Sequence, residues 1–446
     1  MHAGCSRHPC PRRSRLISFR SRLISFRSHL LSLPMLSGGS KCDRNGPRRP
    51  YAHEVGIRRV RIGAGTWVVA GLVVVALVCI VTGFLPRSDA GALGERIAPV
   101  LGFVVAITIV AELARDAAVF DVVSQRLARW GRGRVLVLWA LVVALAVVST
   151  VFLSLDTTAV IVTPVVVVLA QSIGVSPLPF ALATVWLANT ASLALPVSNL
   201  TNLLAAPAIG DGPAAFFALS WAPTLVGILV PVAILTILHR RTVFGAYETP
   251  VARRPADPTL FWSATGILLV LMPLLALTHD VWIPAAVAAL ALIGLFAVRR
   301  RRALRLSLVP WQALALAASL FVLVEAAHAQ GLLDFLISPT ANGDAPGDLF
   351  RLAALGAVSA NGINNLPAYL VLEPAAGDPV ALMALLIGVN IGPLITPWAS
   401  LATLLWHHRI VALGVTIRWS RFMLWGVVAA VPTVLAAVLV LWLVSG

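Results

Sequence analysis

The sequence predicts an all-α polytopic membrane protein built from two inverted repeats, each with a re-entrant hairpin and a broken transmembrane helix. Hydrophobic residues make up 59% of the 446 residues and charged residues only 12%, which is too apolar for a soluble domain. Several apolar stretches approach the ~20 residues that cross a bilayer as a helix. Polar residues and prolines interrupt the stretch 153–202 twice, and a second pair of interruptions follows in the same order at 358–406. We therefore expect about nine full spans and two hairpins.

The basic charge of the chain is concentrated near its N-terminus. The formal net charge is +16, but residues 1–65 hold 14 Lys or Arg against two acidic residues. The remainder is close to neutral, which excludes nucleic acid as a partner. Residues 1–60 are rich in Arg, Ser and Pro and show no apolar face, so we expect a disordered basic extension. Cys79 is the sole cysteine beyond that extension, so we expect no disulfide framework, no metal site and no cofactor.

The first predicted repeat covers residues 66–238. An arginine-rich amphipathic connector precedes two apolar arms that meet at a polar tip, which is the pattern of a hairpin that enters and leaves on one side. In order, we expect spans at about 66–85 and 97–115, the hairpin at 135–172, a span at about 178–208 that is broken around 192–200, and a continuous span at about 215–238.

The second predicted repeat covers residues 282–446 and runs in the opposite orientation. A basic loop at 239–258 and a linking span at 259–277 precede it. Because arginine-rich loops stay cytoplasmic, the first hairpin enters from the cytoplasm and the second, at about 347–375, from outside. The same rule places the N-terminus inside and the C-terminus outside. We expect the protein in the cytoplasmic (inner) membrane. The remaining spans are expected at about 282–298, 309–328 and 422–443, with a broken span around Asn390 to Ser400.

The hairpin tips and helix breaks together predict one polar chamber. Each break leaves backbone N–H and C=O groups unpaired, and these are tolerated only where they face protein, water or solute. Asp156 is the only carboxylate near the middle of the membrane in either hairpin or broken helix, and such a group is by default a functional candidate. The side chains that we expect to bind solute or protons are Asp156, Thr157, Asn189, Ser192, Ser198, Asn199, Asn364, Asn365, Thr396 and Ser400.

Each of these candidates also has a purely structural interpretation. Asp156 could cap a helix at the hairpin turn. The amides and hydroxyls around Asn189 to Asn199 could join neighbouring helices by hydrogen bonds. Asn364 and Asn365 favour the functional interpretation, because they occupy the second tip as Asp156 occupies the first.

Four motifs resemble those of bacterial arsenite-efflux permeases of the ArsB type, within the ion-transporter superfamily. They are SLDTTAVIVTPVVVVLA from Ser154, VWLANTASLALPVSNLTNLL from Val185, NNLP from Asn364 and NIGPLITPWASLATLLW from Asn390. The resemblance covers about residues 66–446. It implies inverted repeats with hairpins that meet tip to tip, and export of arsenite or antimonite in exchange for protons, in some members with a soluble ATPase subunit. One departure is Leu155-Asp156, where many of these permeases carry Asn-Asp.

Related sodium-coupled dicarboxylate carriers and sodium/proton antiporters share this architecture and are the alternative. Arsenite is a neutral trihydroxide at neutral pH, so hydroxyl and amide groups can hold it without a cation. No Arg or Lys falls within a tip or a break, which argues against a dianion. The spans also lack a serine–histidine arrangement or a His/Asp/Glu metal set, so we expect a secondary transporter and not an enzyme. Membrane lipid, a homodimer and a soluble ATPase subunit are the partners considered.

Overall fold

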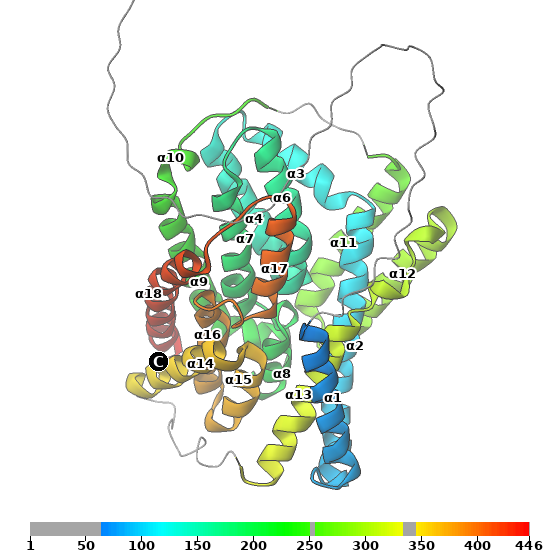
Figure 1. Cartoon of the computed structure of the whole chain (residues 1–446), viewed down its shortest axis with the longest axis vertical. Coiled ribbons are helices and arrows are strands. Elements are labelled where there is room, and N and C mark those ends of the chain that lie inside the picture. The colour runs from blue at the N-terminus through cyan, green and yellow to red at the C-terminus, as the bar shows by residue number, and fades with distance from the viewer. Residues whose placement is uncertain (1–63, 250–254, 333–344, 446) are drawn as a thin grey trace, which may run out of the picture. The chain divides into compact units, whose positions relative to one another are not determined.

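The apolar stretches fold into helices that run side by side (Figure 1). The computed structural model describes residues 64–249, 255–332 and 345–445, so the extension expected at 1–60 lies outside the described residues. Within those ranges no strand forms, and the one β-type contact is an isolated bridge between Arg134 and Ala246. Eight of the described helices are long and apolar enough to cross a membrane. The predicted all-α polytopic class is confirmed.

Five helices form a group that we call the frame. Helix α1 packs on α13 and α2 packs on α12, while α11 lies against α12. The two pairs are reciprocal, since the first helix of each predicted repeat contacts the second helix of the other, as a two-fold relation between the repeats requires. The frame helices are α1 (Ala64–Val81), α2 (Arg87–Asp116), α11 (Pro258–Leu277), α12 (Trp282–Arg299) and α13 (Trp311–Ala329).

The two hairpins reverse direction through the same unusual backbone conformation. Ser154 has φ 96° and ψ 160°, and Asn364 has φ 96° and ψ 153°, a region that glycine alone adopts without strain. The match sets the register between the repeats: Ser154 corresponds to Asn364, and Asp156 therefore to Leu366. The first hairpin consists of α4 (Val135–Leu153), α5 (Leu155–Thr157), a π-helical turn (Thr158–Val162) and α6 (Thr163–Ser172); the second consists of α14 (Pro346–Ile363) and α15 (Asn365–Leu372).

The broken helices also match each other. In both, an α-helix tightens into a 3-10 turn, and an extended residue, Asn199 or Ser400, then precedes the next helix. A proline within each break, Pro196 or Pro397, suits this interruption because it cannot donate a helical hydrogen bond. The first consists of α7 (Pro177–Thr190), 3-10 turns at Ala191–Leu193 and Pro196–Ser198, and α8 (Leu200–Ile209); the second consists of α16 (Pro379–Ile391), a 3-10 turn at Gly392–Leu394 and α17 (Leu401–Ala412).

A long helix closes each repeat, and the two pack against each other. They are α9 (Gly212–Leu238) and α18 (Trp419–Ser445). Glycine permits two close approaches in the second repeat. A Cβ at Gly388 would lie 2.2 Å from the carbonyl oxygen of Ala353 in α14, and one at Gly426 would lie 2.1 Å from that of Leu394. Helix α18 therefore lies directly on the second break.

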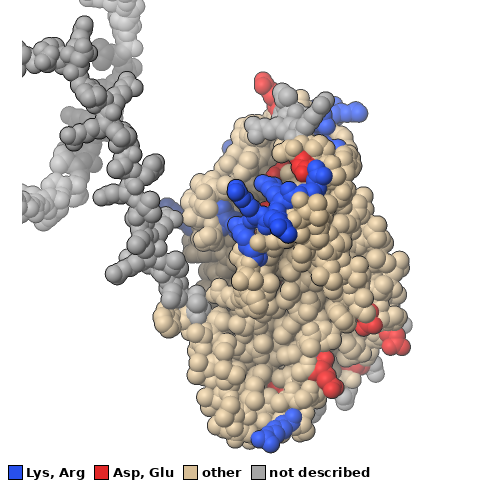
Figure 2. Space-filling view, turned by 90° about the vertical axis from the view of Figure 1, so that its right-hand side faces the viewer, with Lys and Arg blue, Asp and Glu red and all other residues tan. Residues whose placement is uncertain are grey.

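Most of the described arginines gather at one end of the molecule, which we call the arginine-rich end. Figure 2 shows a cluster of basic side chains on the upper part of the face that it draws, with one more at the lower end, and the cluster lies at the end at which Figure 1 places α3 (Val119–Trp130) and α10 (Arg240–Val243). Arg299, at the end of α12, donates to Asp257 before α11, and the Arg300 side chain donates to the backbone oxygen of Asp116. The first hairpin begins at this end and the second at the opposite end, so the repeats are inverted (Figure 1).

Candidate functional site

Both hairpin tips and both helix breaks meet at one cavity, which we call the chamber. Its volume is about 110 Å³, enough for several water molecules or one small solute. Side chains of α2 and α13 close it on the frame side, and all of these are apolar except Thr108 of α2. The residues from tips and breaks that line it include Ser154, Leu155, Asp156, Asn364, Asn365, Leu366, Val197, Asn199 and Ser400.

Asp156 is the only ionisable side chain among the described residues that line the chamber. It lies in the first turn after the strained Ser154, and it is half-buried. Ser154 supplies the helix cap, because its Oγ accepts the backbone N–H of Thr157 at 3.4 Å. Within the described part of the chain, the Asp156 carboxylate has no hydrogen-bond or ion-pair partner. Its charge is therefore free to interact with whatever enters.

The second tip offers an amide in place of a carboxylate. Asn364 acts as the cap there: its Oδ1 accepts the N–H of Leu366 at 3.3 Å, and its Nδ2 donates to the carbonyl oxygen of Trp398 at 2.9 Å. The backbone N–H of Asn365 donates to the Ala399 oxygen at 2.8 Å, which ties the tip to the second break. No described residue pairs with the Asn365 side-chain amide, which lines the chamber.

A buried amide network joins the two breaks. Asn199 Nδ2 donates to Asn390 Oδ1 at 2.7 Å, and Asn390 Nδ2 donates to Asn202 Oδ1 at 2.7 Å. Thr201 Oγ1 also donates to Asn390 Oδ1, at 3.0 Å. Sequence reasoning did not assign Asn390 to the site. The signal that could have identified it is its equivalence to Asn189: each is the last residue but one of the helix that precedes a break, α16 or α7.

Ser400 is the extended residue that precedes α17. Its Oγ is buried and has no hydrogen-bond partner among the described residues, although it lines the chamber. A buried hydroxyl without a partner costs about 1–3 kcal/mol unless water or solute satisfies it. Ser400 is therefore ready to bind a polar group in the chamber.

The structure brings five of the ten predicted residues to the chamber: Asp156, Asn199, Asn364, Asn365 and Ser400. The other five are Thr157, Asn189, Ser192, Ser198 and Thr396, and they do not line it. Their hydrogen bonds lie within the protein. Ser198 Oγ, for example, donates to the Val151 oxygen at 2.8 Å and so holds the first break against the first hairpin.

Asn361 on α14 is a structural residue that sequence reasoning missed. Its Nδ2 donates to the Gly392 oxygen at 2.9 Å, and its Oδ1 accepts the N–H of Thr396 at 2.9 Å. Trp398 Nε1 donates to the Asn361 backbone oxygen at 2.7 Å. The Asn361-Gly362 pair in an apolar hairpin arm was the available signal. These bonds fix the second break against the second hairpin.

A wider pocket lies at the arginine-rich end, between the first hairpin and α3. Its volume is about 970 Å³, and Arg115, Asp116, Asp121, Arg300 and Arg409 line it. Burial raises the pKa of the Asp121 carboxyl, and the nearby Arg115 partly opposes this shift. This pocket is charged, whereas the chamber holds one carboxylate and otherwise neutral groups.

Inverted repeats, paired hairpins and a polar chamber formed by broken helices define the class: a multi-pass membrane transporter. Residues 58–378 match the family model described as CitMHS, citrate transporter, and the chain belongs to this family. The match spans the whole of the first repeat and more than half of the second.

Curated relatives and one solved structure agree with this class. The arsenical pump membrane protein of Escherichia coli (strain K12) is 28% identical over an alignment of 383 positions that covers 80% of this chain and 89% of the relative. The arsenical pump membrane protein of Yersinia enterocolitica is 28% identical over an alignment of 352 positions that covers 74% of this chain and 82% of the relative. The crystal structure of the Alcanivorax borkumensis YdaH transporter, described as having an unusual topology, aligns with a TM-score of 0.52 at 14% identity. That alignment covers 85% of this chain and 97% of YdaH, and it shows the fold alone.

Proposed function

We propose that the protein exports arsenite or antimonite across the cytoplasmic membrane in exchange for protons. The observation that carries the proposal is the chemistry of the chamber, where one carboxylate, amides and hydroxyls occur without a cationic side chain among the described residues. A neutral trihydroxide both donates and accepts hydrogen bonds, so Asn365, Asn199 and Ser400 suit it. The names of the relatives above support the same solute.

In this proposal Asp156 carries the proton. The carboxylate faces the chamber without a protein partner, so it can exchange a proton each time water reaches it. A proton bound here would alternate with the solute. One charge moving through 100 mV supplies about 2.3 kcal/mol, which sustains roughly a 50-fold solute gradient.

A sodium-coupled carboxylate carrier, or a sodium/proton antiporter, is the second candidate. The family description, citrate transporter, favours a carboxylate. A tricarboxylate would bring several negative charges beside Asp156, with no Arg or Lys in the described chamber lining to balance them. The helix N-termini that follow Ser154 and Asn364 carry only partial positive charge. The balance of charge therefore favours a neutral solute.

Transport into everted membrane vesicles tests the proposal. Arsenite accumulation should survive the removal of sodium and collapse when a protonophore is added. Asp156→Asn should abolish accumulation, while Asp348→Asn, a matched change in the first turn of α14 and outside the chamber, should not. Sodium-dependent accumulation would overturn the proton coupling. Normal transport by Asp156→Asn at equal abundance would remove Asp156 from the mechanism.

We also propose that the arginine-rich end faces the cytoplasm, so that the C-terminus lies outside. The gathering of arginines near α3 and α10 supports this orientation. A soluble ATPase subunit and a second copy of the chain are the proposed protein partners. Co-purification from membranes and the mass of the solubilised particle test them.

A further inference from the structure

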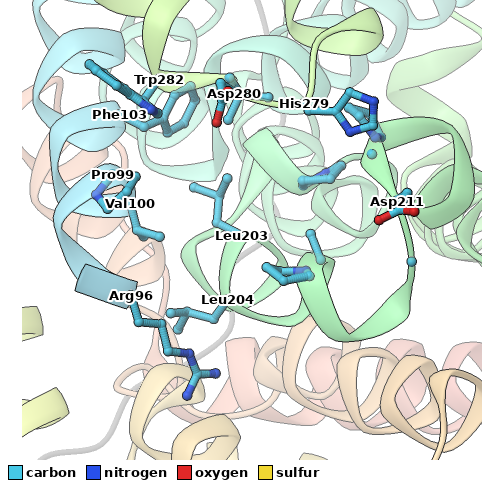
Figure 3. A pocket seen from close by; sticks show the side chains of 17 residues that line it. Arg96, Pro99, Val100, Phe103, Leu203, Leu204, Asp211, His279, Asp280 and Trp282 are labelled. Carbon is cyan, nitrogen blue, oxygen red and sulfur yellow. The ribbon is translucent and has the colours of Figure 1, made fainter. Parts of the chain in front are cut away.

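A further cavity lies at the end opposite the arginine-rich end, and we call it the vestibule. Its volume is about 360 Å³. It is lined by α2, by α8 with the turn that follows, and by the turn between α11 and α12 (Figure 3). Arg96, Asp211, His279 and Asp280 contribute its polar groups, while Leu203 points into the space between α2 and α8.

Of the residues that the structure describes, only two line both the vestibule and the chamber: Phe103 on α2 and Leu203 on α8. Phe103 is 1% exposed and Leu203 is 9% exposed. The wall between the two cavities is therefore one layer of side chains. Phe103 belongs to the frame and Leu203 follows the first break, so a shift between these parts would open or close the wall.

A proline lies one helical turn from each of these residues, on the vestibule side. Pro207 is four residues after Leu203, and because proline has no N–H, the Leu203 carbonyl lacks its helical partner. Pro99 is four residues before Phe103 and likewise removes one hydrogen bond from α2. Both prolines line the vestibule. Helices bend most easily where such a bond is missing, so α2 and α8 can both bend next to the wall.

We propose that Phe103 and Leu203 form an apolar gate through which solute passes between the chamber and the vestibule. An apolar constriction one side chain thick resists hydrated ions more than neutral polar solutes, because an ion would have to shed water there. The gate would thus contribute to selectivity for an uncharged solute. The identity of the solute rests on the proposed function, whereas the position of the gate does not.

Thiol labelling tests the gate without any transported solute. The four native cysteines, Cys5, Cys10, Cys42 and Cys79, are first replaced by serine in the full chain. Leu200→Cys then reports on the chamber and Ala206→Cys on the vestibule, since each lines only one of the two cavities. A membrane-impermeant thiol reagent is applied from the vestibule side in oriented membranes.

With the gate intact, the thiol at position 206 should react rapidly and the one at position 200 slowly. Phe103→Ala should speed the reaction at position 200 about tenfold or more, which corresponds to a barrier lowered by about 1.4 kcal/mol. The reaction at position 206 should not change. Val100→Ala is the matched control, because Val100 lines the vestibule one turn away and does not line the chamber.

Leu203→Ala provides the same measurement if Phe103→Ala does not accumulate in membranes. Equal reaction rates at positions 200 and 206 in the parent would overturn the gate, and so would unchanged rates at position 200 in both variants. If the labelling pattern appears but arsenite uptake does not, the gate stands and the proposed solute fails.

Discussion

Substitution of Asn390 should lower the stability of the protein by an amount that can be worked out from its hydrogen bonds. Its side chain accepts hydrogen bonds from Asn199 and Thr201 and donates one to Asn202, all between the two broken helices. Truncation by Asn390→Ala removes three bonds at once and leaves three buried polar groups with fewer partners. Because this network connects the two repeats, its loss should lower the free energy of unfolding and also weaken the contact between the two breaks that line the chamber.

The expected magnitude follows from the number of bonds. Side-chain hydrogen bonds between helices in membrane proteins contribute about 0.6 kcal/mol each on average and about 1.7 at most. Three of them give a loss of about 2–5 kcal/mol in the free energy of unfolding. Asn189→Ala is the matched control. Asn189 donates one bond, to the Val185 oxygen in its own helix, and its Oδ1 is buried without a partner among the described residues. Asn189→Ala should therefore lower the free energy of unfolding by about 0.5 kcal/mol or less.

The assay is unfolding of the solubilised protein by a denaturing detergent, followed by tryptophan fluorescence. Asn199→Ala combined with Asn390→Ala should destabilise the protein by less than the sum of the single changes, with a coupling of about 0.6–1.7 kcal/mol. Equal losses for Asn390→Ala and Asn189→Ala would refute the reasoning. If the stability losses of the two single variants simply add in the double variant, the direct hydrogen bond between Asn199 and Asn390 is refuted.

Two further predictions concern packing and charge. Gly388→Ala places a Cβ 2.2 Å from the Ala353 oxygen, so it should lower the free energy of unfolding by about 1–3 kcal/mol. Gly102→Ala is the control, because no atom would lie within 4 Å of its added Cβ, and it should not lower the free energy of unfolding in the same detergent assay. Equal losses of stability in the two variants would contradict the close approach at Gly388. The Arg299 hydrogen bond lowers the pKa of the Asp257 carboxyl, so this pair stabilises the fold above the ordinary aspartate range and loses that effect as the pH falls through the lowered pKa. Thermal unfolding of Asp257→Asn should therefore approach that of the parent at acid pH; a difference that persists there would contradict the pairing.

The order of the elements followed from the sequence because each element has a local signal. Apolar length identified the spans, and clustered polar residues with prolines identified the tips and breaks. The second span was expected at about 97–115, yet α2 begins at Arg87. Its first turns carry charged residues and lie beyond the apolar stretch, so hydropathy alone did not include them.

The residues that form the chamber and its wall were harder to predict from the sequence. Asp156 and Asn365 stand out as polar residues at tips, but Phe103 and Leu203 resemble any other lipid-facing or core residue. The contact between Asn199 and Asn390 joins residues that are 191 positions apart, and no local pattern indicates it. The φ of 96° at Ser154 and Asn364 was equally hidden, because glycine, the usual marker of that conformation, is absent from both positions.

The register between the two tips explains why the repeats cannot be chemically equivalent. Since Ser154 corresponds to Asn364, Leu155 corresponds to Asn365 and Asp156 to Leu366. Each tip thus presents one polar and one apolar side chain after its strained residue, but in the opposite order. The carboxylate and the amide of Asn365 therefore reach the chamber from positions that the symmetry does not relate. A solute held between them meets a titratable group on one side and a neutral one on the other. Under the proposed exchange, protonation of Asp156 would change the binding of the solute from one side only, which is the asymmetry that coupling to a proton requires.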